Sequence, residues 1–198
     1  MREIGRIVRL QVQNGSIKTG TKPFQTYTPT PNLTAVETLR ITANGAEGID
    51  GNGESLPDIH NAAHPQTKFT GDNGISIGFT GHYATMRTRF GDHMSDGIAG
   101  ENIIVENEGL VSLDMLEKGV VIVGDQGEVR IGPWVILHPC GPFTRFCLQL
   151  PGETKPDRRV TEGLQFLEHG LRGFSAVYEP NLPPVDIRIG DMVFAVDE

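Results

Sequence analysis

Short runs of alternating apolar and polar residues dominate the hydropathy pattern of the chain. Residues 4–13 alternate imperfectly between the two classes, and Asn14-Gly15 after them is a typical turn dipeptide, so the pattern predicts a first strand here. Apolar runs and glycine turns predict further strands at residues 34–43, 75–80, 120–123, 129–131, 134–137, 174–178 and 192–196, and a tight turn that runs into an apolar strand at residues 97–105. This succession of brief strands and tight turns is typical of a barrel-like sheet.

Helical spacing occurs in only a few places. Residues 81–91 lie between two glycines and predict a short helix, residues 113–118 predict a helical turn, and residues 159–171 carry partly helical apolar spacing that stops near Gly170. Two segments predict loops, namely residues 19–31, rich in Thr and Pro, and residues 45–57, with four glycines. The predicted fold class is therefore mostly β, with a few short helices.

Composition supports one globular domain. The chain has 198 residues, 37% of them hydrophobic and 21% charged, with 25 glycines and 13 prolines. A chain of this size buries roughly 70% of its extended surface on folding, which is enough for a core. There is no internal repeat, low-complexity linker or shift in composition. We therefore expect residues 1–198 to form a single domain.

Charge and cysteine content exclude several classes of protein. The net charge of −8 argues against a nucleic-acid binder, which needs clustered Lys and Arg. Residues 1–10 hold no continuous apolar segment of a secretory signal, and no stretch is long enough to span a bilayer. The two cysteines are expected to be free thiols in a reducing compartment. We expect a cytoplasmic protein that binds neither nucleic acid nor membrane.

Four segments carry a family resemblance when they are taken in order. They are GIAGENIIVENEGL (97–110), EKGVVIVGD (117–125), HPC (138–140), and LRGFSAVYEP (171–180) followed by IRIGDMV (187–193). Together they resemble the MOSC family, whose domain occurs at the C-terminus of molybdenum cofactor sulfurases and in small bacterial proteins. The matching positions are Gly97, Gly100, Glu101, Asn102, Gly109, Leu110, Gly119, Gly124, Pro139, Cys140, Arg172, Gly173, Gly190 and Asp191.

The N-terminal half fits this pattern more loosely. Residues 48–52 lie where the family has a Gly-Asp, and Asn52 replaces the acid. Residues 58–65 correspond to the family's histidine-containing loop, which makes His60 a candidate ligand residue.

The resemblance implies a β-barrel-like MOSC fold and a link to the molybdenum cofactor, molybdopterin. Two functions are compatible with it. In the first, the protein is a sulfur transferase that carries sulfur as a cysteine persulfide, or a molybdenum-dependent catalytic component. In the second, it is a non-catalytic module that binds or carries the cofactor for a partner enzyme. The implied partners are the cofactor or another small ligand, a cysteine desulfurase that supplies sulfur, and a molybdoenzyme.

Cys140 is the residue on which either chemistry depends. A thiolate is a strong nucleophile toward sulfur and a good ligand for soft metal centres, so Cys140 is both the candidate catalytic residue and the candidate molybdenum ligand. His138 and Arg145 lie near it in sequence. The alternative is that Cys140 is a small buried hydrophobe in an inert relic of the fold. Cys147, in the apolar run FCLQL, is expected in the core.

The residues expected around the cofactor come from several segments. The glycine-rich turn of GIAGEN offers backbone N–H groups to a ligand, and Asn102 can hydrogen-bond a heterocycle or an anion. An ordinary strand-initiating turn is the alternative. The full set of candidate cofactor-binding residues is Gly100, Glu101, Asn102, His60, Arg87 and Arg172, with Arg89 as a further cationic candidate.

Other chemistries lack their sequence signatures. His60 and His64 are four residues apart, as in a helical zinc site, but Pro65 disfavours helical backbone at His64, and Asn61 stands where the usual glutamate would be. There is no Walker loop, GxGxxG, GxSxG or CxxC motif.

Overall fold

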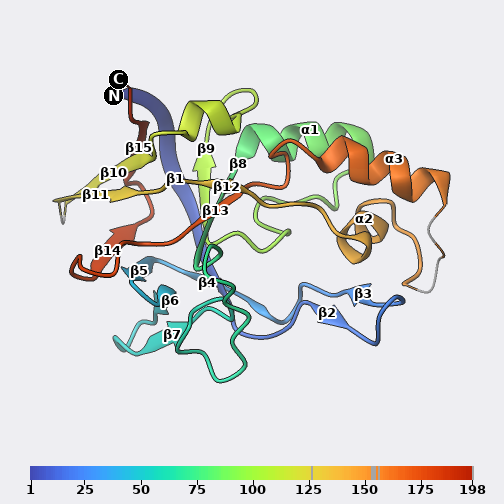
Figure 1. Ribbon diagram of the computed structural model, residues 1–198, viewed down its shortest axis with the longest axis horizontal. Helices are drawn as coiled ribbons and strands as arrows, with labels where there is room; N and C mark the ends of the chain where they lie inside the picture. The colour runs from blue at the N-terminus through green and yellow to red at the C-terminus, as the bar shows by residue number, and fades with distance from the viewer. Residues whose placement is uncertain (126, 153–154, 156, 198) are drawn as a thin grey trace.

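The computed structural model describes residues 1–125, 127–152, 155 and 157–197. It is mostly β, with 34% strand and 17% helix, as the hydropathy pattern predicts (Figure 1). The strands are β1 (Arg2–Gln13), β2 (Lys18–Thr19), β3 (Thr26–Tyr27), β4 (Leu33–Val36), β5 (Thr38–Thr42), β6 (Gly45–Ile49), β7 (Ser55–Pro57), β8 (Ile75–Phe79), β9 (Ile103–Glu106), β10 (Val120–Gly124), β11 (Gly127–Ile131), β12 (Val135–Ile136), β13 (Phe174–Ala176), β14 (Val185–Arg188) and β15 (Met192–Ala195).

The first strand, β1, is the spine of the main sheet. It is 12 residues long, and it pairs with β15 near its beginning, with β9 in its middle and with β4 at its end. The sheet runs in the order β11-β10-β15-β1-β9-β8-β13-β12, with β4 added beside β1. The sheet curls into half a barrel. The two chain termini meet at one end of the paired strands β1 and β15, where the Met1 amino group pairs with Asp197 at 2.9 Å (Figure 1).

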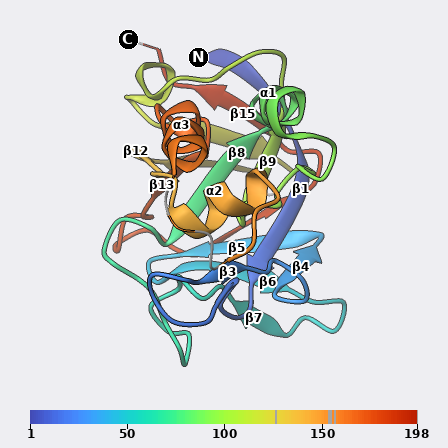
Figure 2. The ribbon, with the colours of Figure 1, turned by 90° about the vertical axis from the view of Figure 1, so that its right-hand side faces the viewer.

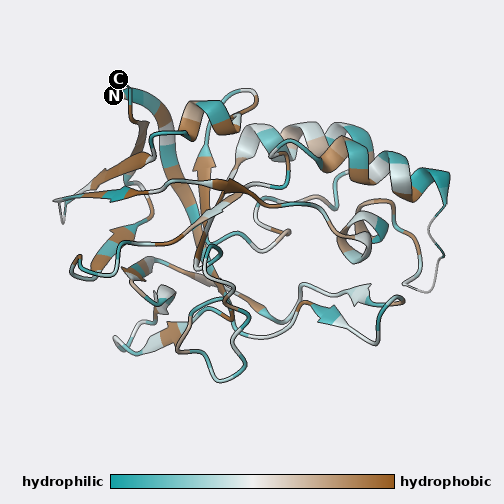
Figure 3. Cartoon of the chain, in the orientation of Figure 1, coloured by the Kyte–Doolittle hydropathy of each residue, from teal (hydrophilic) through white to brown (hydrophobic). Residues whose placement is uncertain are grey.

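A second, smaller sheet closes the open side of this half barrel. Its order is β14-β5-β6-β7, and it lies across the lower end of β1 in Figure 2. The core between the two sheets is mainly aliphatic, with Ile7, Leu10, Leu39, Ile41 and Ile77 all fully buried. The apolar strand interiors appear as brown segments in Figure 3.

One parallel connection interrupts the antiparallel pattern. β8 and β9 pair in parallel, and α1 (Thr80–Phe90) and the loop after it connect them. Parallel neighbours need such a crossover because a tight turn cannot join them. Residues 97–102 are the last part of this crossover and lie directly before β9. Hydrogen bonds to Gln11 of β1 and Ser76 of β8 place this glycine-rich segment beside both strands.

Two more helices flank the end of the sheet that carries this crossover. They are α2 (Gly141–Cys147) and α3 (Arg158–Leu167), and α2 lies between α3 and β3 (Figure 2). A second buried cluster fills the space between these helices and α1, and it is rich in aromatic rings. Its members include Tyr27, Tyr83, Phe143, Cys147 and Leu167. Among the described residues, no helix has both the length and the apolar character needed to cross a bilayer.

Most predicted elements are present at or near their predicted positions, including α1, α3, the 3₁₀ turn Leu113–Leu116 and strands β8 to β13. Three predictions are wrong. Residues 45–57 form β6 and β7 instead of a loop, residues 34–43 form two strands that break at Glu37, and the predicted loop 19–31 contains β3.

The helix α2 and the strand β14 are additional elements that the pattern did not predict. Pro142 lies in the first turn of α2, where its missing N–H has no helical partner to lose and its fixed φ suits the helix. The Gly-Pro pair therefore starts a helix here, although it is also typical of loops.

Candidate functional site

Cys140 faces a pocket of about 170 Å³ built from segments far apart in the sequence. β1, β2, β8 and β13 contribute to it, as do the crossover loop before β9 and the segment between β12 and α2. The lining residues are Gln13, Lys18, His60, Asn73, Ser76, Ala99, Gly100, Leu137, His138, Cys140, Arg172 and Ser175. We call this the Cys140 pocket.

Cys140 is held at the start of α2 by local hydrogen bonds. It is the residue before the helix, with extended φ of −124°, and its carbonyl accepts from the backbone N–H of Thr144 at 2.9 Å and from the Thr144 hydroxyl at 3.0 Å. The side chain is half-buried, whereas Cys147 at the other end of the helix is fully buried. The two thiols therefore differ in access.

Arg172 enters the pocket from a buried hydrogen-bond network. Its guanidinium donates to Glu101 Oε1 at 3.2 Å and to the Ala99 carbonyl at 2.6 Å, and it stacks on the Phe143 ring at 5.0 Å. The Tyr83 hydroxyl donates to the other oxygen of Glu101 at 2.6 Å. Ion pair and hydrogen bonds together fix Arg172 in one orientation.

Burial sets the ionisation behaviour of this network. Burial raises the pKa of Glu101 above its ordinary value, although the charge of Arg172 and the Tyr83 hydrogen bond act in the opposite direction. Burial also opposes the charge on Arg172, but Glu101 and other neighbours outweigh it and raise the pKa of Arg172. Burial raises the pKa of the Cys147 thiol to about 12. Cys147 is thus a neutral packing residue.

Two glycines allow these segments to approach each other. Gly173, directly after Arg172, has φ of +99°, and a Cβ there would lie 2.6 Å from the Ile77 carbonyl oxygen. Gly100 has φ of +96°, and its Cβ would press on Ile17 at 3.2 Å. Both backbone conformations suit glycine, which has no side chain to clash. Gly100 and Gly173 therefore allow the backbone segments around the pocket to pack closely.

The described lining residues carry positive or neutral side chains. Lys18 and Arg172 are cationic, His60 and His138 are titratable, and no Asp or Glu lines the pocket. Burial, followed by repulsion from Lys18, lowers the pKa of the neighbouring Lys68. Lys18, Lys68 and Arg172 thus gather positive charge in and beside the Cys140 pocket, although the net charge of the chain is −8. An anion is the ligand that this arrangement favours.

The two histidines are each oriented by an acid outside the lining. His60 Nδ1 lies 3.0 Å from Asp58 Oδ1, and His138 Nδ1 lies 3.0 Å from Glu168 Oε2. A carboxylate beside Nδ1 accepts a hydrogen bond from a protonated Nδ1, which leaves Nε2 of a neutral ring as an acceptor.

Several predicted site residues lie together, and others do not. Cys140, Gly100, His60 and Arg172 share the pocket, as expected. The expectation that Asn102 lines it is wrong. Its amide oxygen accepts from the N–H and hydroxyl of Ser76, and its amide nitrogen donates to Asp58 and to the Gln11 carbonyl. The Asn102 side chain therefore hydrogen-bonds to β1, to β8 and to the loop that contains Asp58, and it does not face the pocket.

Glu101, Arg87 and Arg89 also lie elsewhere than expected, because none of them lines the Cys140 pocket. Glu101 is buried and reaches the pocket only through Arg172. Arg87 is outside the lining, where it binds Asp96 at 2.8 Å and the Met94 carbonyl at 3.0 Å, so it stabilises the loop after α1. Arg89 stacks on Phe166 at 4.7 Å instead of facing the pocket.

Sequence reasoning did not identify Lys18, which occurs in a two-residue strand without a motif. Arg145, which lies near Cys140 in sequence, is buried and donates to the carbonyls of Pro23 and Gln25. Within the described part of the chain, no group of three or more His, Cys, Asp or Glu is arranged to hold a metal ion. The segment with His60 and His64 is a series of turns, and the backbone N–H of Gln66 donates to His64 Nδ1.

Comparisons with known proteins show which solved structures share this fold, and they assign no function. No family model matches the sequence, and no curated protein matches it. The chain is similar in structure to the YUAD protein from Bacillus subtilis, with a TM-score of 0.57 and 15% identity over 98% of this chain and 96% of that chain. It is also similar to a protein described only as hypothetical, with a TM-score of 0.53 and 12% identity over 98% of this chain and 68% of that chain. At such low identity these likenesses establish a shared β-rich fold alone.

Proposed function

We propose that the protein is of the MOSC type and that Cys140 takes up sulfur as a persulfide, within a pocket that also accepts the molybdenum cofactor. The observation that carries this proposal is a half-buried thiol in a pocket lined by Lys18 and Arg172 and, among the described residues, by no carboxylate. Persulfide sulfur and the phosphate of molybdopterin are both anionic near neutral pH, so this lining suits them electrostatically.

The sulfur step is the transfer of the outer sulfur of a persulfide from one thiol to another, without net oxidation. The Cys140 thiolate attacks the outer sulfur of a donor persulfide, R–S–S–H. A new S–S bond forms to Cys140, the donor S–S bond breaks, and R–S⁻ leaves, giving Cys140–S–S–H. Lys18 and Arg172 stabilise the anionic forms of reactant and product. The donor is a cysteine desulfurase, because a separate protein must supply the persulfide.

The donor set of the pocket also fits the cofactor. Cys140 offers the soft thiolate that would bind molybdenum, while Lys18 and Arg172 offer positive charge to the phosphate. Bound there, the cofactor would supply a molybdenum centre as the acceptor of sulfur. The volume of about 170 Å³ accommodates only part of such a group, so the remainder would extend beyond the pocket.

The test combines persulfide and metal analysis of protein purified from a host that makes molybdopterin. After incubation with a desulfurase and cysteine, mass spectrometry should find one added sulfur on Cys140, and Cys140→Ser should have none. Cys147→Ser is the matched control and should load normally. Loading that persists in Cys140→Ser would refute the proposal. Bound pterin in a protein that accepts no sulfur would instead select the non-catalytic carrier function.

A further inference from the structure

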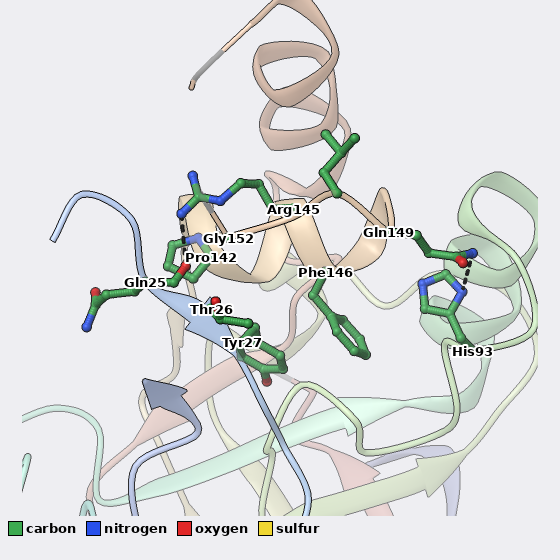
Figure 4. Close-up of a pocket in the computed structure, with 10 residues that line it drawn as sticks. Gln25, Thr26, Tyr27, His93, Pro142, Arg145, Phe146, Gln149 and Gly152 are labelled. Carbon is green, nitrogen blue, oxygen red and sulfur yellow. Dashed lines mark hydrogen bonds between the residues drawn. The ribbon is translucent and has the colours of Figure 1, made fainter. Parts of the chain in front are cut away.

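A second cavity, which shares no lining residue with the Cys140 pocket, lies beside α2 and the segment after it. It has a volume of about 310 Å³, at the lower end of the range for small-molecule sites. Residues from β3, α2 and the loop after α1 line it, with Tyr27 and Phe146 in its middle (Figure 4). We call it the Arg145 cleft.

The charge on Arg145 has no counterion among the described residues. The side chain is only 4% exposed, and the ion pairs of the described chain do not include it. One terminal nitrogen donates to the carbonyls of Pro23 and Gln25 at 3.2 and 3.0 Å, while the buried Nε has no described acceptor. A buried guanidinium without a carboxylate is costly unless a ligand supplies negative charge.

A second buried donor lies across the cleft. The Gln149 amide nitrogen donates to His93 Nδ1 at 3.3 Å, so the neutral ring carries its proton on Nε2. That Nε2 is buried and has no acceptor among the described residues. Figure 4 shows Arg145 and His93 on opposite sides of Phe146, so two donors without acceptors bracket an aromatic centre.

The aromatic centre fits a flat ring. Tyr27 and Phe146 have centroids 5.2 Å apart and are tilted by 47°, and the Tyr27 hydroxyl is held by the Ile98 carbonyl at 3.0 Å. No Asp or Glu is among the residues that line the cleft in the described chain. The described lining therefore lacks a negative charge beside Arg145 and a hydrogen-bond acceptor beside His93.

We propose that the Arg145 cleft binds a planar aromatic carboxylate, with the carboxylate at Arg145, the ring against Tyr27 and Phe146, and a neutral acceptor at His93. This site is independent of the sulfur chemistry proposed for Cys140, because its lining residues are different.

The test uses three probes and isothermal titration of the intact protein. Methoxynaphthoate carries both the carboxylate and the acceptor, naphthoate lacks the methoxy acceptor, and methoxynaphthalene lacks the carboxylate. We expect methoxynaphthoate to bind about tenfold or more tightly than methoxynaphthalene, as a charge-assisted hydrogen bond implies, and about two- to tenfold more tightly than naphthoate. Equal affinities for the charged and neutral probes would overturn the proposal.

Variants assign each contact. Arg145→Met should remove the advantage of the carboxylate. His93→Phe keeps a ring against Phe146 and should remove only the advantage of the methoxy group, so it tests the proposal even if Arg145→Met fails to fold. Arg89→Met removes an arginine outside the cleft and should change neither ratio. Unchanged ratios in His93→Phe, or loss of binding in Lys18→Met at the other pocket, would also overturn the proposal.

Discussion

Two arginines beside α2, the partly buried Arg172 and the buried Arg145, show how one fold treats the same charge in different ways. Arg172 stacks on Phe143 and donates to the buried carboxylate of Glu101, so its charge has an anionic partner within the chain while the guanidinium still lines the Cys140 pocket. Arg145 belongs to α2 itself and donates only to backbone carbonyls among the described residues. Removing Arg172 leaves the buried carboxylate of Glu101 without its cationic partner, whereas removing Arg145 leaves no carboxylate of the described residues without one. The contrast separates an arginine with a carboxylate partner from one whose proposed ligand would supply the negative charge.

The largest effect is expected from Arg172→Met. Breaking a buried ion pair by removing one partner costs about 3–5 kcal/mol, because the remaining charge is buried without compensation. Burial already raises the pKa of Glu101, and loss of the Arg172 charge raises it further. A carboxyl with a raised pKa in the folded state destabilises that state as pH rises, so the loss measured by urea denaturation should shrink as pH falls from about 7 to about 5.

A double variant sharpens this prediction. Glu101→Gln keeps an acceptor for the Tyr83 hydroxyl and removes the stranded charge, so Arg172→Met with Glu101→Gln should be more stable than Arg172→Met alone near neutral pH. A double variant at least as unstable as the single one would show that packing, and not charge, explains the loss.

Cys147→Ser should have the next largest effect. The side chain is fully buried, and burying a hydroxyl without a partner costs about 1–3 kcal/mol. The midpoint of chemical denaturation should fall by the corresponding amount, with an unchanged slope. Cys147→Ala is a control that separates the hydroxyl from the change in volume. A Cys147→Ser protein as stable as the parent would mean that the serine finds a partner.

Arg145→Met should cost less, about 1 kcal/mol, in direct contrast to Arg172→Met. Two hydrogen bonds are lost, each worth about 0.5–1.5 kcal/mol, but the removal of a buried uncompensated charge offsets part of that loss. The carbonyls left behind belong to Pro23, which is exposed, and Gln25, which is partly exposed, so water can replace the guanidinium. A cost as large as that of Arg172→Met, measured in the same urea titration, would contradict the absence of an acid partner for Arg145 among the described residues.

The comparison also explains which features the sequence could predict. Local patterns identified β1, α1 and most of the sheet, because alternation and glycine turns are properties of neighbouring residues. They failed at residues 45–57, where glycines indicated a loop. In the fold, a Cβ at Gly48 would lie 2.8 Å from Val36 Cγ1, so this glycine permits close packing within a strand.

Long-range placement limited prediction of the two sites. Cys140, Gly100, His60 and Arg172, which the resemblance placed in one candidate site, line the same pocket in the fold. The resemblance misplaced Asn102, whose four hydrogen bonds depend on three distant segments. It gave no sign of the Arg145 cleft, since the partners of Arg145 lie 120 and 122 residues away in the chain.

The smallest change in stability is expected from Cys140→Ser, within about 0.5 kcal/mol of the parent. Its side chain is half-buried and faces the Cys140 pocket, so the serine hydroxyl can hydrogen-bond to water instead of being stranded, and the two side chains are similar in size. The chemical change should nevertheless be complete. An aromatic disulfide reagent should react with one thiol of the folded parent near pH 8 and with none in Cys140→Ser. Cys147 contributes no reaction, because its pKa of about 12 and its full burial leave almost no accessible thiolate. If Cys140→Ser retained a fast-reacting thiol, or lost as much stability as Cys147→Ser, the difference between the two ends of α2 would not exist, and Cys140 would be a packing residue.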